Sequence, residues 1–378
     1  MKKILFISPR NPYSGRYSGD VIRSLKIINL LKKKYHLDVV CLKKNNLNIK
    51  EKSLIAFTHP NIFLKFVYCI ISILKLEPIQ FGLFFSNKVK NFINNNANNY
   101  DYLFFSQVRS SQYLPKNYYG KTILDMGDLY SDNYYQSFKN LNFFNPMKYI
   151  YFFESLLVKK SERKIFENFD RITLFSKKEI EKIDKRYKKK ICKIDWSVEK
   201  VVSNFSYSLE KSKVLFIGNL GYLPNIMACK YFIRKILPKL KLKIPDVKLT
   251  IIGNINYLDR IILSKNENVE ILGPKKNLKK FIRNAYCGLA NLSIATGVQS
   301  KVLTYMSNGL PVICHSKVAV NFGNNVLSYR QDKDLIQKLI LLKSNKKLSQ
   351  KYSKMSIQFS KKFVWKKISL KYLELLNF

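Results

Sequence analysis

The chain has 378 residues, with 68 lysines and arginines against 25 aspartates and glutamates, so its formal net charge is +43. Hydrophobic residues make up 47% of the sequence and aromatic residues 14%, which excludes a disordered basic chain. A chain of this length exceeds the size at which a single hydrophobic core stops growing, so we expect two domains.

The first half of the sequence alternates apolar runs with helical segments, as in β-α-β units. Nearly continuous apolar runs predict strands at 3–8, 37–42, 102–105, 121–126 and 171–176. A helix is expected at 21–33, between the first two strands. Strands that are apolar on both faces are typical of a parallel sheet that helices cover on both sides.

The same pattern begins again near Ser212. It predicts strands at 213–219, 247–254, 269–273, 287–293 and 311–315, with helices around 227–244, 278–285 and 301–308. The stretch from Asp195 to Lys211 has mixed polarity and no period, which indicates a linker.

These patterns predict an α/β protein of two doubly wound, Rossmann-like domains that face each other across a cleft. We expect an N-terminal domain at 1–200 and a C-terminal domain at 201–350. A helix at 351–378 either packs back on the N-terminal domain or simply ends the second one.

One segment, Asn61–Leu76, is strongly apolar but is interrupted by Lys65 and is too short to span a bilayer. Two interpretations remain open: a helix on a membrane surface, and a buried core helix. The positive charge would suit an anionic membrane, phosphorylated substrates or nucleic acid. The sequence has no zinc finger, RNP strand or basic helix with heptads, so no specific nucleic acid is expected.

Cysteines and histidines give no sign of a metal site. The six cysteines lack C-x-x-C spacing and the chain has three histidines, so we expect reduced thiols and no metal. The sequence opens as MKKILFIS without the apolar stretch of a secretory signal, which predicts a cytoplasmic protein.

The loop after the first strand holds Gly15 and Gly19 just before a helix that opens near Asp20. Glycine permits close backbone approach, and a helix N-terminus offers N–H groups to an anion or acceptor. In the alternative interpretation the glycines only turn the chain and Asp20 caps the helix.

The second domain repeats this arrangement where Gly218 and Gly221 flank Asn219 after a strand, a place where a diphosphate would fit. Further along, a helix begins near Ser300 with Lys301 in its first turn. A cation there opposes the helix dipole, so either a bound phosphate accompanies Lys301 or its side chain is solvated.

Several segments resemble the GT-B glycosyltransferases of family four, and within them a bacterial subgroup associated with exopolysaccharide and envelope glycan loci. The segments are 18–42, 124–137, 153–179, 216–225 and 297–313, of which the last two, FIGNLGYLPN and GVQSKVLTYMSNGLPVI, are the most specific. The resemblance implies a GT-B architecture, a nucleoside-diphosphate sugar bound mainly by the second domain, an acceptor bound mainly by the first, and transfer with retention of configuration. It implies no cofactor and no metal.

The resemblance also implies roles for individual residues. Asp128 and Lys301 are the catalytic candidates. The donor-binding candidates are Gly218, Asn219, Gly221, Thr296, Gly297, Val298, Gln299, Ser300, Lys301 and Thr304. The candidates in an acceptor-side or phosphate-side loop are Gly15, Gly19, Asp20 and Arg23.

The sequence departs from the family pattern at three places, one of which is the loop from Asn219 to Asn225, where relatives often carry Arg and Lys. Thr296 and Thr304 stand where many relatives carry glutamates, and a hydroxyl cannot match the charge-assisted hydrogen bond of a carboxylate. The usual histidine is absent from residues 104–112. Asp128 or Asp132 is expected to face the cleft, and capping of the following helix is the alternative for each.

The sequence therefore predicts a cytoplasmic, peripherally membrane-bound glycosyltransferase that acts on a glycan or lipid-linked acceptor in capsule, lipopolysaccharide or exopolysaccharide assembly. Three alternatives remain: a nucleotide-sugar epimerase, a catalytically degenerate relative that only binds donor or a partner, and a basic nucleic-acid-binding protein.

Overall fold

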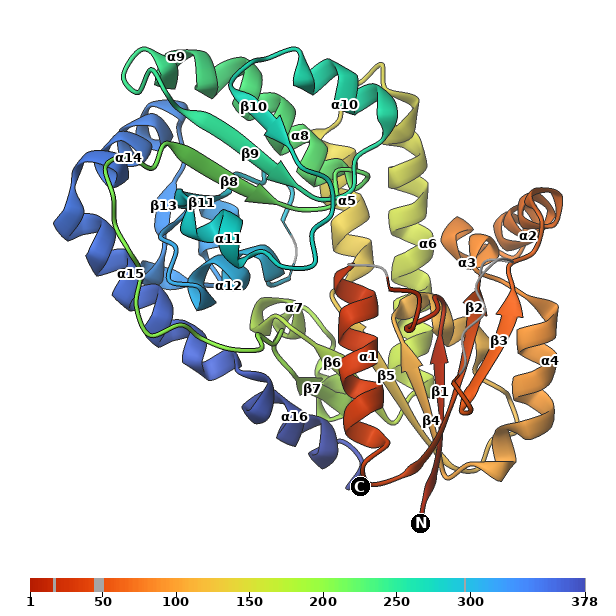
Figure 1. The fold of residues 1–378 in the computed structure, drawn as a ribbon. Helices are drawn as coiled ribbons and strands as arrows, with labels where there is room; N and C mark the ends of the chain where they lie inside the picture. The colour runs from red at the N-terminus through yellow and green to blue at the C-terminus, as the bar shows by residue number, and fades with distance from the viewer. Residues whose placement is uncertain (16–17, 44–50, 296, 378) are drawn as a thin grey trace. The chain divides into compact units, whose positions relative to one another are not determined.

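The computed structural model describes residues 1–15, 18–43, 51–295 and 297–377 (Figure 1). The chain divides into two compact units. Unit 1 comprises Met1–Asp195 together with Ser369–Phe378, and unit 2 comprises Trp196–Ile368. Each unit is built on one parallel sheet with connecting helices, so the predicted pair of α/β domains is confirmed.

Within the described residues, the sheet of unit 1 has seven parallel strands in the order β3-β2-β1-β4-β5-β6-β7. Phe6 in β1 pairs with Val39 in β2 and with Phe104 in β4, and all three side chains are fully buried. The strands are β1 Lys3–Ser8, β2 His36–Lys43, β3 Leu54–Thr58, β4 Tyr102–Ser106, β5 Lys121–Gly127, β6 Arg171–Leu174 and β7 Ile191–Lys193. Burial on both faces explains why these strands read as continuous apolar runs.

The helices of unit 1 connect these strands. They are α1 Gly19–Leu31, α2 Ile62–Leu74, α3 Ile79–Leu83, α4 Asn87–Asn96, α5 Tyr130–Asn140, α6 Pro146–Asn168 and α7 Lys177–Glu181. Helices α5 and α6 pack together through the rings of Phe138 and Phe152, whose centroids are 5.0 Å apart. Helix α2 is exposed along most of its length, so its interpretation as a buried core helix is wrong.

The last part of the chain belongs to unit 1. Helix α16 spans Trp365–Glu374, and from Ser369 onward the residues pack within that unit. The Tyr372 hydroxyl donates to Asp125 at 3.0 Å, and the Tyr102 hydroxyl donates to the carbonyl of Leu376 at 2.8 Å. Unit 1 is therefore assembled from two distant stretches of sequence.

Unit 2 has a sheet of six parallel strands over its described residues, in the order β10-β9-β8-β11-β12-β13. The strands are β8 Lys213–Ile217, β9 Lys248–Ile252, β10 Val269–Ile271, β11 Ala285–Ala290, β12 Val312–His315 and β13 Leu327–Tyr329. The helices are α8 Leu223–Tyr231, α9 Leu237–Lys241, α10 Tyr257–Ser264, α11 Lys279–Arg283, α12 Ser300–Ser307, α13 Ser316–Ala319, α14 Asp332–Ser344 and α15 Lys346–Ser360. A π turn at Phe232–Ile236 joins α8 to α9, where Pro238 lacks the N–H that a continuous α-helix needs.

Candidate functional site

The strand order reverses once in each sheet, between β1 and β4 in unit 1 and between β8 and β11 in unit 2. In open parallel sheets, ligands bind at the carboxyl ends of the strands beside such a reversal. In unit 2 the loops that leave these two strands carry Gly218–Gly221 and Gly297–Ser300. The structure thus brings together, at the expected edge, the two segments that were predicted to bind a donor.

Lys301 lies in the first turn of α12 and is buried, with 8% of its surface exposed. Its Nζ donates to Oδ1 of Asn225 at 2.5 Å and lies 4.1 Å from the ring centroid of Phe216. Burial lowers the pKa of the Lys301 ammonium to about 7. Because the side chain is buried, the interpretation as a solvated lysine is wrong. No carboxylate of the described residues raises the pKa of Lys301, so its charge is incompletely compensated.

Asn225 connects Lys301 to the loop after β8. Its Nδ2 donates to the carbonyl of Asn219 at 2.8 Å, and Oδ1 of Asn219 accepts from the backbone N–H of Gly221 at 3.0 Å. One chain of hydrogen bonds therefore runs from α12 through α8 to the glycine loop. Asn225 is not among the donor-binding residues predicted from the sequence, although it ends the segment 216–225.

Glycines allow the loops to pack this closely. A Cβ on Gly218 would lie 3.0 Å from the Asn225 side chain. Gly253, which the sequence analysis missed, follows β9 with φ +152°, and a Cβ there would lie 1.8 Å from the Gly218 carbonyl oxygen. Since no side chain fits at that distance, Gly253 fixes the position of the donor-side loop.

A turn that contains Gly297 leads into the N-terminus of α12. Gly297 has φ +60°, and its carbonyl accepts from Nδ2 of Asn321 at 2.7 Å, which holds the turn before the helix. Val298 packs against the core of unit 2. Helix α12 begins at Ser300, and the side chain of its N-cap residue, Gln299, makes no capping hydrogen bond to it. Thr296 lies outside the described residues.

Thr304 stands one turn into α12, at the position where the family resemblance implies a second glutamate. Its hydroxyl donates to the carbonyl of Ser300 at 3.0 Å. The donor capacity of this hydroxyl is therefore used within the helix, and its oxygen retains only the ability to accept a hydrogen bond.

In unit 1 the predicted loop residue Arg23 lies inside the protein instead. Its Nε and one terminal nitrogen donate to the two oxygens of Asp125 at 2.8 and 2.9 Å, and its guanidinium stacks 4.2 Å from the ring centroid of Phe175. Asp125 also accepts from Thr173 at 2.5 Å and from Tyr372. The guanidinium is committed to Asp125, so its expected place facing a phosphate is corrected to a core ion pair.

The loop after β1 leads to Asp20, which forms hydrogen bonds with two other polar side chains. Asp20 accepts hydrogen bonds from Arg10 at 2.5 Å and from Nε2 of Gln107 at 2.8 Å. Burial alone would raise the pKa of Asp20, but these partners lower it below its ordinary value. The N-cap of α1 is Ser18, so the interpretation of Asp20 as that cap is wrong. Gly15 has φ +69° with open space around it, and Gly19 begins the helix.

Two carboxyl groups meet beyond the end of β5. Asp128 follows the strand, and Glu179 in α7 accepts from the backbone N–H of Leu129 at 3.2 Å. Burial raises the pKa of both carboxyls, and the proximity of Asp128 raises that of Glu179 further. Oδ1 of Asp128 and Oε2 of Glu179 are buried without a hydrogen-bond partner in the described part of the chain, which fits groups that hold protons near neutral pH.

Neither Asp128 nor Asp132 is the N-cap of the following helix, so the capping alternative is wrong for both. Helix α5 begins after the N-cap Leu129, and the backbone N–H of Ser131 in its first turn donates to Glu162 at 3.1 Å, not to either aspartate. Asp132 lies in the first turn and forms an ion pair with Lys182.

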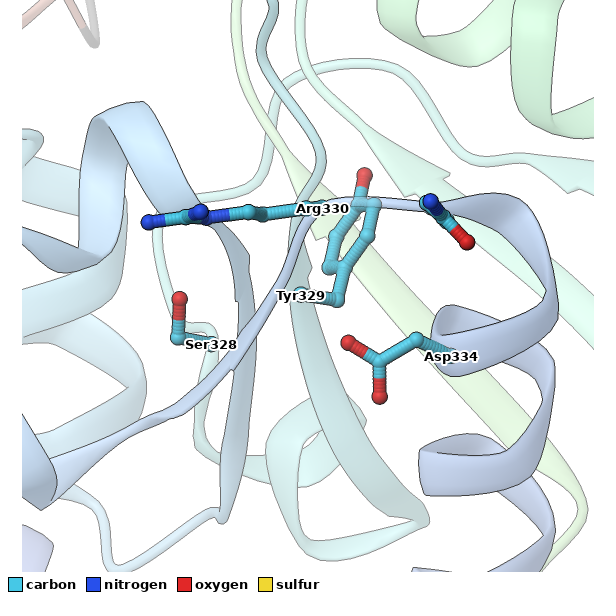
Figure 2. A pocket seen from close by; sticks show the side chains of 5 residues that line it. Ser328, Tyr329, Arg330 and Asp334 are labelled. Carbon is cyan, nitrogen blue, oxygen red and sulfur yellow. The ribbon is translucent and has the colours of Figure 1, made fainter.

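A shallow pocket lies at another place in unit 2. It has a volume of about 370 Å³ and is lined by Ser328, Tyr329, Arg330, Gln331 and Asp334, where β13 gives way to α14 (Figure 2). Asp334 is itself paired with Lys338 at 2.5 Å. None of the predicted donor residues lines this pocket, and β13 is the outer strand of the sheet, so we do not assign it to the site. Over the described residues, no group of three or more His, Cys, Asp or Glu side chains could hold a metal ion.

Solved structures share this architecture over the whole chain. A variant of TarM from S. aureus, in complex with Fondaparinux, alpha-GlcNAc-glycerol and UDP, has a TM-score of 0.68 at 11% identity and covers 100% of both chains. HepE from Anabaena, in complex with UDP and glucose, has a TM-score of 0.66 at 13% identity over 100% of both chains. The N-terminal domain of trehalose-6-phosphate phosphatase from Candida albicans has a TM-score of 0.65 at 9% identity, covering 100% of this chain and 97% of that one. The chain therefore has the two-domain GT-B fold.

The sequence match is confined to unit 2. Residues 211–345 match the family model described as "Glycosyl transferases group 1". No curated protein matches the sequence. The matched range contains every donor-side residue described above, including Lys301, Asn225 and Gly253.

Proposed function

We propose that this chain is a retaining glycosyltransferase that moves a sugar from a nucleoside diphosphate to a lipid-linked or oligosaccharide acceptor. In this proposal it acts without a metal, in bacterial capsule, lipopolysaccharide or exopolysaccharide assembly. It works in the cytoplasm as a peripheral protein on the inner face of the cytoplasmic membrane. Unit 2 binds the donor and unit 1 the acceptor.

The observation that carries the proposal is the set of groups at the reversal between β8 and β11. A helix N-terminus that its own N-cap side chain does not cap lies beside a buried lysine that, over the described residues, bonds to an amide oxygen rather than a carboxylate. Both lie in a domain that matches the group 1 glycosyltransferase model. Both features favour an anion, and the TarM and HepE structures named above contain UDP.

Lys301 and the first N–H groups of α12 would bind the diphosphate. The leaving nucleoside diphosphate develops negative charge as the sugar departs, and fixed donors that surround this charge lower the barrier. The ammonium has three donors, of which Asn225 takes one. An approaching phosphate raises the pKa of Lys301 above about 7 and keeps the side chain charged.

Asp128 is the candidate for proton transfer on the acceptor side. Burial raises the pKa of Asp128 to about 7, and a group that titrates near neutral pH is suited to accept a proton from a hydroxyl and release it again. Glu179, which accepts from the backbone N–H of Leu129, would fix the backbone directly after Asp128.

A thermal-shift screen of the purified protein against UDP, GDP, CDP, ADP and their common sugars tests the proposal. Binding to the folded state raises Tm, so we expect one nucleoside diphosphate to stabilise the protein and its sugar conjugate to be consumed with a glycan acceptor. A folded protein that responds to none of them would contradict the proposal.

A second candidate is a protein that binds donor without turning it over. It is favoured by Thr304, whose hydroxyl is engaged with Ser300 where relatives offer a carboxylate. Stabilisation by a nucleotide sugar that stays intact in the presence of acceptors would favour this candidate over the transferase.

A further inference from the structure

Helix α2 of unit 1 has its apolar side chains on the outside. Of its large hydrophobic residues, eight are exposed: Ile62, Phe63, Leu64, Phe66, Ile70, Ile71, Ile73 and Leu74. Phe63 exposes 70% of its surface, Phe66 64% and Leu74 78%. A soluble surface helix normally has the opposite pattern, with its apolar stripe turned toward the core.

The face of α2 that packs on the protein carries smaller and more polar groups. Ser72 is the buried residue of the helix, Tyr68 accepts a hydrogen bond from Asn87 at 3.2 Å, and Cys69 donates to the carbonyl of Ile79 at 3.8 Å. A Cβ on Gly82 would lie 2.5 Å from the carbonyl oxygen of Tyr68, so α3 packs directly against α2. These contacts fix which side of α2 points outward, beside α3 at the margin of unit 1 (Figure 1).

The length of α2 suits a helix that lies in the membrane plane. Its 13 residues extend roughly 20 Å, whereas the hydrocarbon core of a bilayer is about 30 Å thick. In the described part of the chain, no helix combines the length and the apolar character that crossing a bilayer requires.

The surroundings of the helix are basic. Residues 61–90 contain Lys65, Lys75, Lys88 and Lys90 against a single acidic residue, Glu77. The contact between Asn87 and Tyr68 places the first turn of α4, with Lys88 and Lys90, next to α2. Lysines beside an apolar helix are attracted by anionic lipid headgroups.

We propose that the outer face of α2 inserts into the headgroup and acyl boundary of an anionic bilayer, with the four lysines at the headgroups. A bilayer fits better than a second copy of the chain because two molecules that each carry a net charge of +43 repel one another. The inference deepens the proposed function, on which its biological meaning rests, by naming the surface that would meet the membrane.

Vesicle co-sedimentation of the full chain tests the inference, with vesicles of pure phosphatidylcholine or of phosphatidylcholine with 30 to 40% phosphatidylglycerol. We expect wild type to bind the anionic vesicles, and the double variant Phe63→Ser/Phe66→Ser to partition at least tenfold less. The matched control is Leu258→Ser/Ile262→Ser on α10, whose side chains are 71% and 49% exposed and whose loss is expected to leave binding unchanged.

Three results would overturn the inference. They are equal binding of wild type and the α2 variant, equal binding to both kinds of vesicle, and a wild-type dimer in sedimentation velocity that the α2 variant disperses. All four substitutions are at exposed positions, and circular dichroism melting checks that each variant folds. Since no substrate is present, failure here is distinguishable from failure of the donor-binding screen.

Discussion

Each unit buries one basic side chain on a helix, and the two are compensated very differently. Arg23 in unit 1 donates twice to Asp125, which also accepts from Thr173 and Tyr372. Lys301 in unit 2 has an amide oxygen and an aromatic ring as partners. Burial by itself would lower the pKa of both groups, but the ion pair with Asp125 raises that of Arg23, whereas that of Lys301 falls to about 7.

This difference separates a structural cation from a binding cation. The charge of Arg23 is matched by Asp125, so this ion pair joins α1 to β5 and does not need a bound anion to complete it. The charge of Lys301 is unmatched, so a bound anion would complete its surroundings. Burial alone does not distinguish a structural cation from a binding cation, because the role depends on whether the fold supplies a carboxylate partner.

Removing the partner of each cation has the largest expected effect. Asp125→Ala leaves a buried guanidinium without its carboxylate, and we expect the free energy of unfolding to fall by about 3–5 kcal/mol. Asn225→Ala removes one hydrogen bond from Lys301. Because Lys301 can lose its proton and become neutral, we expect the free energy of unfolding to fall by only about 1–2 kcal/mol. Urea unfolding measures the loss of stability in both variants. Equal losses would contradict the distinction between a paired and an unpaired buried cation.

Replacing Lys301 itself should affect binding rather than stability. We expect Lys301→Met to weaken nucleoside-diphosphate binding about tenfold to a thousandfold, while the variant unfolds at the same or a higher urea concentration than wild type. Calorimetric titration measures the affinity. Lys317→Met, at an exposed lysine of the same unit that donates to the carbonyl of Ser293, is the control expected to bind as wild type does. Unchanged affinity in Lys301→Met would remove Lys301 from the site.

The pH dependence of stability should carry the signature of Lys301. Its folded pKa of about 7 lies below its ordinary value of 10.5, so between these values the unfolded chain binds more protons. The destabilisation caused by burying the charged Lys301 is at its maximum below about pH 7. It declines as the pH rises, by at most about 1.4 kcal/mol per pH unit. Buried acids such as Glu179, whose pKa is raised, contribute with the opposite sign. The measurement is therefore the difference between wild type and Lys301→Met, and a flat difference from pH 7 to 10 would contradict the assignment.

The smallest expected effect concerns the last hydrogen bond to Asp125. Tyr372→Phe removes one hydroxyl from a carboxylate that keeps Arg23 and Thr173, and we expect a loss of about 1 kcal/mol in the free energy of unfolding. Donor binding in unit 2 should be unaffected. A loss as large as that of Asp125→Ala would mean that the tyrosine, rather than the ion pair, holds this region together.

Strands could be predicted well because burial on both faces leaves a local signature. Residues 3–8 form β1 as expected, and each of the other predicted strands lies within a few residues of an observed one. The two glycine loops and the start of α12 were also found, since glycine and helix-start patterns are local.

Other features depend on contacts between distant residues, and the sequence could not reveal them. Lys301 looked equally compatible with a solvated side chain, because its neighbours Phe216 and Asn225 come from other elements. Gly253 is essential only because it meets Gly218 across two loops. The apolar pattern of α2 was clear, but its outward orientation follows from packing against α3.

The two-part composition of unit 1 bears on how the protein is made. Asp125 and its partner Tyr372 are 247 residues apart, and Tyr102 is 274 residues from its partner Leu376. A ribosome that adds 5 to 20 residues per second needs roughly 10 to 50 seconds to travel from Asp125 to Tyr372. Once Lys193 has been added, the nascent first unit has its complete sheet, but for the rest of this interval it lacks the residues that close over Asp125. Unit 2 emerges meanwhile and can fold before the first unit is finished, so the unit that is begun first is completed last.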